Sequence, residues 1–208
     1  MLRAPGAVIA SGNFYPSYLP FPSPPMNADL QPASREVVVF NDTEATHSVM
    51  ATVTDAHAEC QPVVIILMGL PAAGKSTFYA RELAPHGLAH INLDTLHTRN
   101  KELLQIREYL RTGVSFAVDN TNTLPEERAR YIKLASEAGY RIEGYFLRSR
   151  VQECIRNNEE REKKVPIAAI AAMSARLILP SRTEGFDALY FVNRTENGYD
   201  ISPWKENN

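Results

Sequence analysis

The stretch VVIILMGLPAAGKST, residues 63–77, carries the strongest structural signal in this chain. The apolar run VVIILM is typical of a buried strand, and GLPAAGKST matches the pattern G-x-x-x-x-G-K-[ST] in full. A strand before the motif and a helix after it are the context that this pattern requires. We therefore expect a phosphate-binding loop, or P-loop, that holds the phosphates of a nucleotide at the amino end of a helix.

Each part of this motif has a chemical task. Gly69 and Gly74 permit backbone angles that let successive amides point at phosphate oxygens. Lys75 places a positive charge on the β- and γ-phosphates, and Ser76 offers its hydroxyl to Mg²⁺. The predicted cofactors are therefore ATP and Mg²⁺, and the predicted nucleotide-binding residues are Gly69, Leu70, Pro71, Ala72, Ala73, Gly74, Lys75, Ser76 and Thr77. The motif alone leaves a switch, a motor and a kinase open.

From Pro62 onward, short β-branched runs alternate with longer helical stretches. The expected strands are 63–68, 90–93, 115–119, 141–147 and 188–193, and the expected helices are 75–83, 95–111, 125–138, 152–161 and 167–177. The first of these helices should stop before Pro85. Apolar strands separated by helices predict an α/β fold, with a parallel sheet of about five strands covered by helices on both faces. Ligands bind such a sheet at the carboxyl ends of its strands.

Composition limits the remaining possibilities. The chain has 208 residues, a net charge of -2 and 44% hydrophobic residues, which indicates one globular catalytic domain. Its longest apolar run, Val63 to Leu70, is too short to cross a membrane. Two cysteines, Cys60 and Cys154, support neither a disulfide framework nor a zinc cluster. We expect an intracellular protein, cytoplasmic or nuclear and not secreted, and no stable protein partner is predictable.

The first part of the chain has a different character. Half of the 14 prolines precede residue 33, in stretches such as FYPSYLPFPSPP that form neither a helix nor a central strand. We expect residues 1–60 to be a proline-rich, disordered leader, in which the β-prone runs 36–40 and 48–53 are candidates for a short hairpin. Residues 61–208 would then form the P-loop domain.

Polar residues follow the second and third expected strands. Asp94, in INLDTL, could take a proton from an acceptor hydroxyl, or it could simply cap the helix that follows. Asp119, in VDNTN, stands where P-loop proteins often keep a carboxylate that reaches magnesium. Asn120, Thr121 and Asn122 supply hydrogen-bonding groups for an acceptor, although a turn before a helix would also use such residues.

The stretch RNNEEREKKVP, residues 156–166, carries the last signal. So dense a run of charges usually marks a solvated helix face. Here it ends at a proline that begins another helix, so residues 156–177 could also form a helical lid over the nucleotide. An arginine of this lid could neutralise charge on the phosphoryl group in transfer.

Taken together, GLPAAGKST, INLDTL, VDNTN with ERARYIKLASEAGY, CIRNNEEREKKVP and EGFDALYFV resemble the polynucleotide 5′-hydroxyl kinase family over roughly residues 62–193. The resemblance implies a P-loop kinase that transfers the γ-phosphate of ATP to the 5′-hydroxyl end of DNA or RNA. It implies that Lys75 and Ser76 bind ATP and Mg²⁺, that Asp94 is the general base, and that Asp119 places the acceptor or the metal. Arg161 would be the catalytic lid arginine, with Arg156 as the second candidate.

Some members of that family place an arginine three residues after the catalytic aspartate, where this chain has His97. The expected acceptor-binding residues are therefore Asp94, His97, Asp119, Asn120, Thr121 and Asn122. Two alternatives remain open. One is a small-molecule kinase of the same fold, which the near-neutral charge favours; the other is a nucleotide-binding protein without catalysis. Asp94 buried against helix amides would favour the latter.

Overall fold

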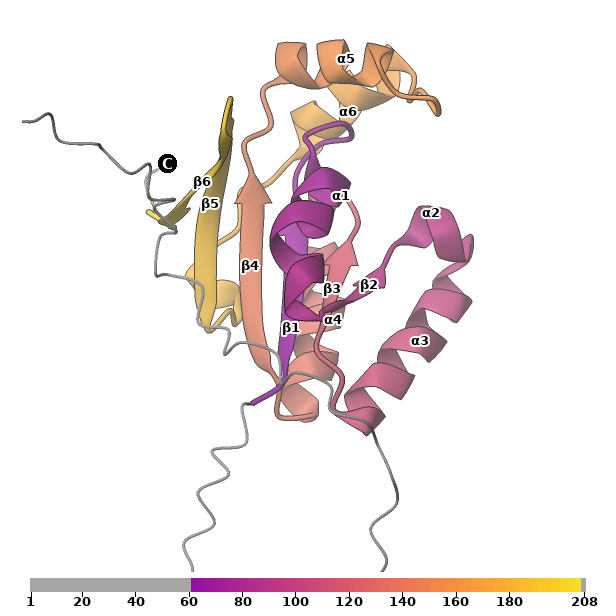
Figure 1. Cartoon of the computed structure of the whole chain (residues 1–208), viewed down its shortest axis with the longest axis vertical. Helices are drawn as coiled ribbons and strands as arrows, with labels where there is room; N and C mark the ends of the chain where they lie inside the picture. The colour runs from indigo at the N-terminus through magenta and orange to yellow at the C-terminus, as the bar shows by residue number, and fades with distance from the viewer. Residues whose placement is uncertain (1–60, 207–208) are drawn as a thin grey trace, which may run out of the picture.

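The computed structural model describes residues 61–206, which build one six-stranded sheet in the order β2-β3-β1-β4-β5-β6 (Figure 1). The strands are β1 Val63–Met68, β2 Ala89–Ile91, β3 Phe116–Asp119, β4 Arg141–Leu147, β5 Ala188–Thr195 and β6 Gly198–Pro203. Strands β1 to β5 pair in parallel, whereas β6 pairs antiparallel to β5. The predicted α/β P-loop fold with five parallel strands is confirmed, and β6 extends it.

Helical segments connect the strands. They are α1 Lys75–Phe78, η1 Tyr79–Leu83, η2 Ala84–His86, α2 Leu93–Leu96, α3 Arg99–Thr112, α4 Pro125–Glu137, α5 Val151–Glu159, α6 Ile167–Arg176 and η3 Arg182–Glu184. Figure 1 shows α5 and α6 together beyond the carboxyl end of β4, close to the loop that leads from β1 into α1. The predicted pair of lid helices is therefore present at the ligand-binding edge of the sheet.

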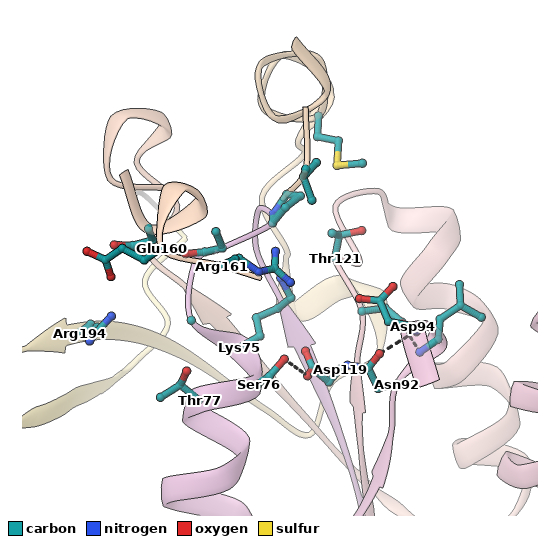
Figure 2. Close-up of a pocket in the computed structure, with 18 of the residues that line it drawn as sticks. Lys75, Ser76, Thr77, Asn92, Asp94, Asp119, Thr121, Glu160, Arg161 and Arg194 are labelled. Carbon is teal, nitrogen blue, oxygen red and sulfur yellow. Dashed lines mark hydrogen bonds between the residues drawn. The ribbon is translucent and has the colours of Figure 1, made fainter. Parts of the chain in front are cut away.

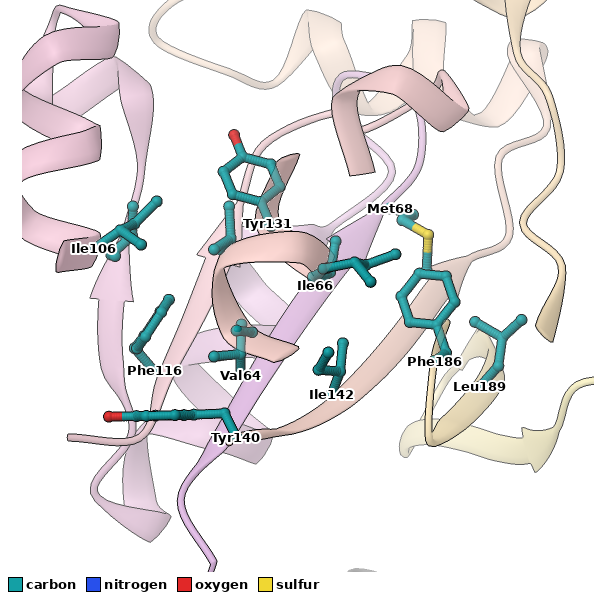
Figure 3. Close-up of a cluster of buried hydrophobic side chains, with 14 of the residues drawn as sticks. Val64, Ile66, Met68, Ile106, Phe116, Tyr131, Tyr140, Ile142, Phe186 and Leu189 are labelled. Atoms are coloured by element: carbon teal, nitrogen blue, oxygen red, sulfur yellow. The ribbon is translucent and has the colours of Figure 1, made fainter. Parts of the chain in front are cut away.

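Strand β1 lies at the centre of the core because both of its faces are covered. Val64, Ile66 and Met68 pack with α3 and α4 on one face (Figure 3), whereas Ile65 and Leu67 pack with α1 and η1 on the other. All of these side chains are buried, and each such apolar side chain contributes about 1.5–3 kcal/mol. A run without polar alternation is what a strand between two helical layers requires.

Gly144 in β4 shows how tightly these layers pack. A Cβ atom at this position would lie 2.5 Å from Leu189 Cδ1 and 2.9 Å from both Met68 Cε and Phe186 Cε1. These distances are shorter than ordinary van der Waals contacts. Glycine is therefore needed here for close approach between strand and side chains.

One helix prediction is confirmed and another is wrong in detail. The helical path that starts at Lys75 ends at Leu83, as predicted, although its second part, η1, is π-helical, and a separate 3₁₀ turn, η2, begins at Ala84. Pro85 is tolerated there because it occupies the first turn, where its missing amide donor has no partner to lose. The expected helix 95–111 is divided into α2 and α3, since His97 adopts a left-handed φ of 64° and Thr98 caps a new helix.

The strand β6 and the residue that follows it were not predicted. Trp204 is only 5% exposed and packs against Phe146 and Phe191. Its indole packs edge-on against the Phe146 ring, at 5.7 Å between centroids. A tail that reads as polar in the sequence thus completes the edge of the sheet by a long-range aromatic contact.

The expected leader, the candidate hairpin and Cys60 lie outside the described residues. Within residues 61–206, Cys154 is a free, buried thiol. No helix in that range has the length and apolar character needed to cross a membrane.

Candidate active site

The side chain of Lys75 holds the P-loop together by hydrogen bonds to its backbone. This side chain is only 8% exposed, and its Nζ donates to the carbonyl oxygens of Gly69 at 3.0 Å and Leu70 at 2.9 Å. Burial lowers the pKa of Lys75 to about 8; Arg161 acts in the same direction, and Asp119 opposes it. The lysine is therefore a desolvated cation whose present partners are neutral carbonyls, which an anionic phosphate can replace.

Glycine at position 69 is required by the shape of the loop. Gly69 has φ of 142°, and a Cβ there would meet Ser149 Oγ at 2.8 Å and Leu147 O at 3.0 Å. Its amide donates to the carbonyl oxygen of Thr121 at 2.9 Å. The β1–α1 loop is thus joined by a backbone hydrogen bond to the turn that follows β3.

A cavity of about 580 Å³ lies between this loop, α2, the β3 turn and the lid (Figure 2). Charged side chains contribute much of its wall: Lys75, Asp94, Arg99, Asp119, Glu160, Arg161 and Arg194. Figure 2 shows Arg161 extending toward Lys75, and Asp94 on the opposite side of the cavity from Thr77 and Arg194. The cavity therefore has a P-loop side and an α2 side.

Asp119 lies at the end of β3, between these two sides. Its buried carboxylate, 4% exposed, accepts hydrogen bonds at Oδ2 from Ser76 Oγ at 2.6 Å, His90 Nε2 at 3.1 Å and Asn92 Nδ2 at 3.1 Å. Burial alone would raise its pKa, but the hydrogen bonds from His90 and Ser76 and the charge of Lys75 hold the pKa below its usual value. Asp119 is therefore an ionised carboxylate beside a hydroxyl, a pair of oxygens that suits Mg²⁺.

His90 was not predicted at this site, since the sequence analysis assigned it only to a strand. Its ring stacks on Tyr79 with 3.9 Å between centroids while Nε2 donates to Asp119. The neighbouring strand β2 thereby fixes one orientation of the carboxylate. A histidine in a short strand gives no sequence signal for such a contact.

Asp94 occupies the first turn of α2 but does not cap it. Asn92 is the capping residue, because its Oδ1 accepts from the Asp94 amide at 2.8 Å. The Asp94 side chain is exposed, lines the cavity, and accepts no hydrogen bond within residues 61–206. The capping alternative left open by the sequence is therefore wrong, and the Asp94 carboxylate is available to a ligand.

The VDNTN turn divides into lining and anchoring residues. Asp119, Asn120 and Thr121 line the cavity. Asn122 does not: it is buried, has a left-handed φ of 47°, and its Nδ2 donates to the Leu67 carbonyl at 2.7 Å. The expected contact of Asn122 with an acceptor is replaced by a structural role, since its side chain ties the turn to the end of β1.

Arg128 supports the same turn from below. It is completely buried and forms a bidentate ion pair with Glu184 at 2.7 Å, while its Nη1 donates to the Asn122 carbonyl at 3.0 Å. Arg128, the first of the two arginines in ERARYIKLASEAGY, is therefore satisfied internally. Such a buried, fully paired guanidinium holds the backbone of the turn in place.

The lid packs directly on the P-loop. Leu70 is buried with Cys154 and Ile170, and Asn157 Nδ2 donates to the Ala72 carbonyl at 3.1 Å. Asn158 closes the loop between α5 and α6 by hydrogen bonds to both the amide and the carbonyl of Val165. Of the two lid arginines that were candidates for a phosphate contact, Arg161 lines the main cavity and Arg156 does not.

Arg156 instead lines a second cavity of about 730 Å³ beside the first. The two cavities share Asn157, Glu160 and Arg194 in their walls. Ala73 also lines the second cavity, whereas Gly69 and Leu70 line neither. Of the predicted nucleotide-binding residues, six of the P-loop and Arg161 therefore line the first cavity, whereas Ala73 and Arg156 line the second.

His97 is the other predicted acceptor residue that does not line the main cavity. It ends α2 in the left-handed conformation, and the cation on that side of the cavity is Arg99, at the start of α3. The cavity wall also contains Asn92, Asn157, Glu160 and Arg194, which were not predicted from the sequence as site residues. Of these, Asn92 was recoverable, because an asparagine two residues before Asp94 has capping potential.

The strand–loop–helix motif, the topology and this cavity define the class: a P-loop protein with the kinase type of α/β fold. A family profile described as "AAA domain" matches residues 99–180. A solved structure, AvrRxo1-ORF1:-ORF2 with ATP, superimposes with a TM-score of 0.53 at 15% identity, covering 69% of this chain and 58% of that one. That likeness concerns the fold alone.

Sequence relatives are more specific. The bifunctional polynucleotide phosphatase/kinase of Schizosaccharomyces pombe is 30% identical over 128 residues, or 59% of this chain and 31% of that protein. A putative bifunctional polynucleotide phosphatase/kinase of Acanthamoeba polyphaga mimivirus is 38% identical over 77 residues, or 37% of this chain and 18% of that protein. The resemblance to the polynucleotide kinase family is thus confirmed, although the matched region spans less than a third of either relative.

Proposed function

We propose that this protein transfers the γ-phosphate of ATP to a hydroxyl group, and that the acceptor is the 5′-hydroxyl end of DNA or RNA. One observation carries the proposal: the Asp94 carboxylate lines the cavity across from the P-loop and has no internal hydrogen-bond partner within residues 61–206. A nucleotide-binding protein without catalysis needs no such group. A kinase needs a base beside the attacking hydroxyl.

The residues of the cavity fit one reaction. Lys75 and the first amides of α1 would bind the β- and γ-phosphates. Asp94 would accept the proton of the acceptor hydroxyl as its oxygen bonds to the γ-phosphorus and the bond to the ADP oxygen breaks. Arg161, which extends toward Lys75, would stabilise the negative charge of the group in transfer.

A magnesium ion fits the same cavity. Ser76 Oγ and Asp119 Oδ2 would hold it, since they are hard oxygen donors 2.6 Å apart. Within residues 61–206 no group of three or more acidic, histidine or cysteine side chains could hold a metal alone. This is consistent with Mg²⁺, which uses few carboxylates and completes its coordination with phosphate and water. Bound there, it would neutralise phosphate charge.

The proposed acceptor is supported by the relatives, because both are described as polynucleotide phosphatase/kinases. The test is transfer from γ-labelled ATP to 5′-hydroxyl and 5′-phosphate oligonucleotides of DNA and RNA. We expect labelling of 5′-hydroxyl ends alone. Labelling of neither DNA nor RNA by a preparation that binds ATP would overturn the acceptor assignment.

Asp94→Asn tests the base. Because the amide cannot take up the proton, transfer should fall about 10²- to 10⁴-fold, while ATP affinity stays within about twofold. Asp200→Asn is the matched control, since Asp200 is an exposed aspartate on β6 outside the cavity. Unchanged transfer in Asp94→Asn would remove the observation on which the proposed function rests.

A small-molecule kinase is a second candidate, and one observation favours it. Arg99 pairs with the carboxylate of Glu102 at 2.8 Å, which offsets its charge on the α2 side of the cavity, the proposed acceptor side. Salt dependence distinguishes the two functions: the affinity for an oligonucleotide should fall steeply between low and high salt, whereas that for a neutral acceptor should not. Transfer to a sugar with salt-independent KM would favour this candidate.

A further inference from the structure

Glu102 is a buried carboxylate that the proposed reaction does not use. It lies one turn into α3 and is 2% exposed. Its Oε2 accepts from Arg99 Nη1 at 2.8 Å, and its Oε1 accepts from Asn120 Nδ2 at 2.6 Å and from the Tyr131 hydroxyl at 3.0 Å. A buried carboxylate persists only where donors satisfy it, and these donors come from α3, the β3 turn and α4.

Two of these donors line the acceptor side of the cavity. Arg99 and Asn120 both belong to its wall, and both are held by the same carboxylate. Arg99 uses Nη1 for this contact and for the Tyr131 hydroxyl at 2.9 Å, while its side chain remains 45% exposed. Glu102 therefore anchors the guanidinium at one nitrogen and leaves the rest of it at the cavity.

Asn120 links Glu102 by hydrogen bonds to the backbone beside Asp94, the proposed base. Its Oδ1 accepts from the Leu93 amide at 3.2 Å, at the start of the helix that carries Asp94. Its Nδ2 is directed to Glu102 and to the Tyr131 hydroxyl at 3.1 Å, so only one orientation of the amide satisfies both ends. Glu102 is thus two hydrogen bonds away from the backbone next to Asp94.

Tyr131 completes the network as a fixed donor. Burial and the Glu102 charge raise the pKa of Tyr131 to about 12, so its hydroxyl keeps its proton at physiological pH. It donates to Glu102 and accepts from Arg99 and Asn120. With the Glu102 carboxylate, the Asn120 amide and the Tyr131 hydroxyl all paired, these three groups have one hydrogen-bonding arrangement.

We propose that Glu102 is a positioning residue for phosphoryl transfer: it holds Arg99 and Asn120 against the acceptor and, through Asn120, fixes the turn that places Asp94. The proposal rests on the proposed function, because it assigns a task to the acceptor side of that site. The proposal distinguishes the function of the α2 side of the cavity from that of the P-loop side. Loss of Glu102 should impair the acceptor while leaving ATP binding intact.

Two substitutions resolve the two contacts. In Glu102→Gln the amide can accept hydrogen bonds at one end only, so the oxygen can stay with Asn120 and Tyr131 while Arg99 is released. We expect KM for the acceptor to rise about 10-fold with kcat little changed. In Glu102→Ala both contacts are lost, and kcat should fall as well, by about 10- to 100-fold, because displacement of a reacting group by about 1 Å has effects of that size.

Glu108→Gln is the matched control. Glu108 lies on the same helix and pairs with Arg111 at 2.7 Å in an exposed ion pair outside the cavity. Its replacement should leave KM for the acceptor, kcat and the Kd for ATP within about twofold of the original. A drop in transfer equal to that of Glu102→Gln would indicate a general effect of α3 and overturn the proposal.

A second measurement does not depend on activity. Hydrogen exchange of the Leu93 amide should become at least about 10-fold faster in Glu102→Ala, because its acceptor Asn120 is no longer held. If the unsubstituted protein phosphorylates none of the acceptors, the proposed function fails, but this exchange still tests the positioning network. If Glu102→Ala does not fold, the KM for the acceptor in Glu102→Gln still tests the contact of Glu102 with Arg99. Unchanged exchange and kcat with only a lower Tm would reduce Glu102 to a structural residue.

Discussion

The P-loop side and the α2 side of the cavity are built in opposite ways. The P-loop side comes mainly from one continuous stretch, since its P-loop lining residues all lie between residues 71 and 77 and include the single lysine of the motif. The α2 side is assembled from the ends of β2 and β3 and the start of α3. A continuous motif can be recognised by its spacing, whereas a site assembled from several elements depends on side-chain contacts that no spacing encodes.

This difference leads to a rule that experiments can break. Changes on the P-loop side should alter nucleotide affinity, and changes on the α2 side should alter transfer at constant nucleotide affinity. Lid residues, which pack on the P-loop and line the same cavity, test where the boundary lies.

The largest effect is expected from Arg161→Ala. Removing the cation that extends toward Lys75 should lower kcat about 10³-fold, as for arginines that neutralise the transferred group. Single-turnover transfer measures it. Arg156→Ala is the control, because Arg156 lines only the second cavity and should affect ATP affinity rather than kcat. A larger kcat effect for Arg156 would exchange the roles of the two arginines.

Asn92→Ala should have the next largest effect, a loss of transfer caused by changes on the α2 side of the cavity. Its Nδ2 donates to Asp119 and its Oδ1 caps the Asp94 amide, so one truncation frees both carboxylate-bearing positions. We expect transfer to fall about 10- to 100-fold, with the ATP affinity measured without Mg²⁺ unchanged. Asn100→Ala, an exposed asparagine of α3 that does not line the cavity, is the comparison. A loss of ATP affinity instead would show that the two sides are not separable at Asp119.

Lys75 predicts a pH dependence of nucleotide affinity. Its pKa of about 8 means that it is charged at pH 7 and largely neutral at pH 9, so a bound phosphate must draw a proton onto it at high pH. The Kd for ATP without Mg²⁺ should therefore be nearly constant below pH 7.5 and rise up to about 10-fold per pH unit above 8. Titration calorimetry measures this, and Lys75→Met should bind weakly with a flat profile. A flat profile in the unsubstituted protein would contradict the predicted pKa shift.

Gly144→Ala should have the smallest effect on the difference between the two sides of the cavity, because it acts on the core that both sides share. The added Cβ would overlap Leu189 and Met68, and such overpacking costs about 1–3 kcal/mol. For a domain of this size Tm should fall by about 2–10 °C, measured by thermal unfolding. Below that temperature, ATP affinity and transfer should both be retained. Selective loss of either would mean that the core controls one side more than the other.

The sequence predicted the fold because its signals are local. VVIILM without polar alternation indicates a strand buried on both faces, and the strands and helices that follow repeat that pattern. It failed at β6, where a polar tail pairs with β5 and Trp204 packs on Phe146. It also failed at His97, where a left-handed residue divides a helix whose composition is continuous.

The candidate site was predictable to a different extent on its two sides. Lys75, Ser76 and Asp119 lie where the motif and the strand end predict them. The role of Asn122 was not predictable, because which asparagine of DNTN turns inward depends on the backbone φ of one residue. Nor was that of Arg99, whose place in the cavity wall depends on the fold. Glu102 and Tyr131 read as ordinary helix residues, and only the fold brings them together under Asn120.

The hydrogen bond from the Gly69 amide to the Thr121 carbonyl joins the P-loop to the β3 turn through backbone atoms alone. The spacing between the P-loop, which would hold ATP, and the β3 turn, which would face the phosphate acceptor, is therefore set without any side chain. On the α2 side, by contrast, the side chains of α2 and α3 would set which acceptor is held and how it is placed. For the proposed phosphoryl transfer, one backbone hydrogen bond would therefore fix the spacing of the two loops, while side chains would determine the acceptor.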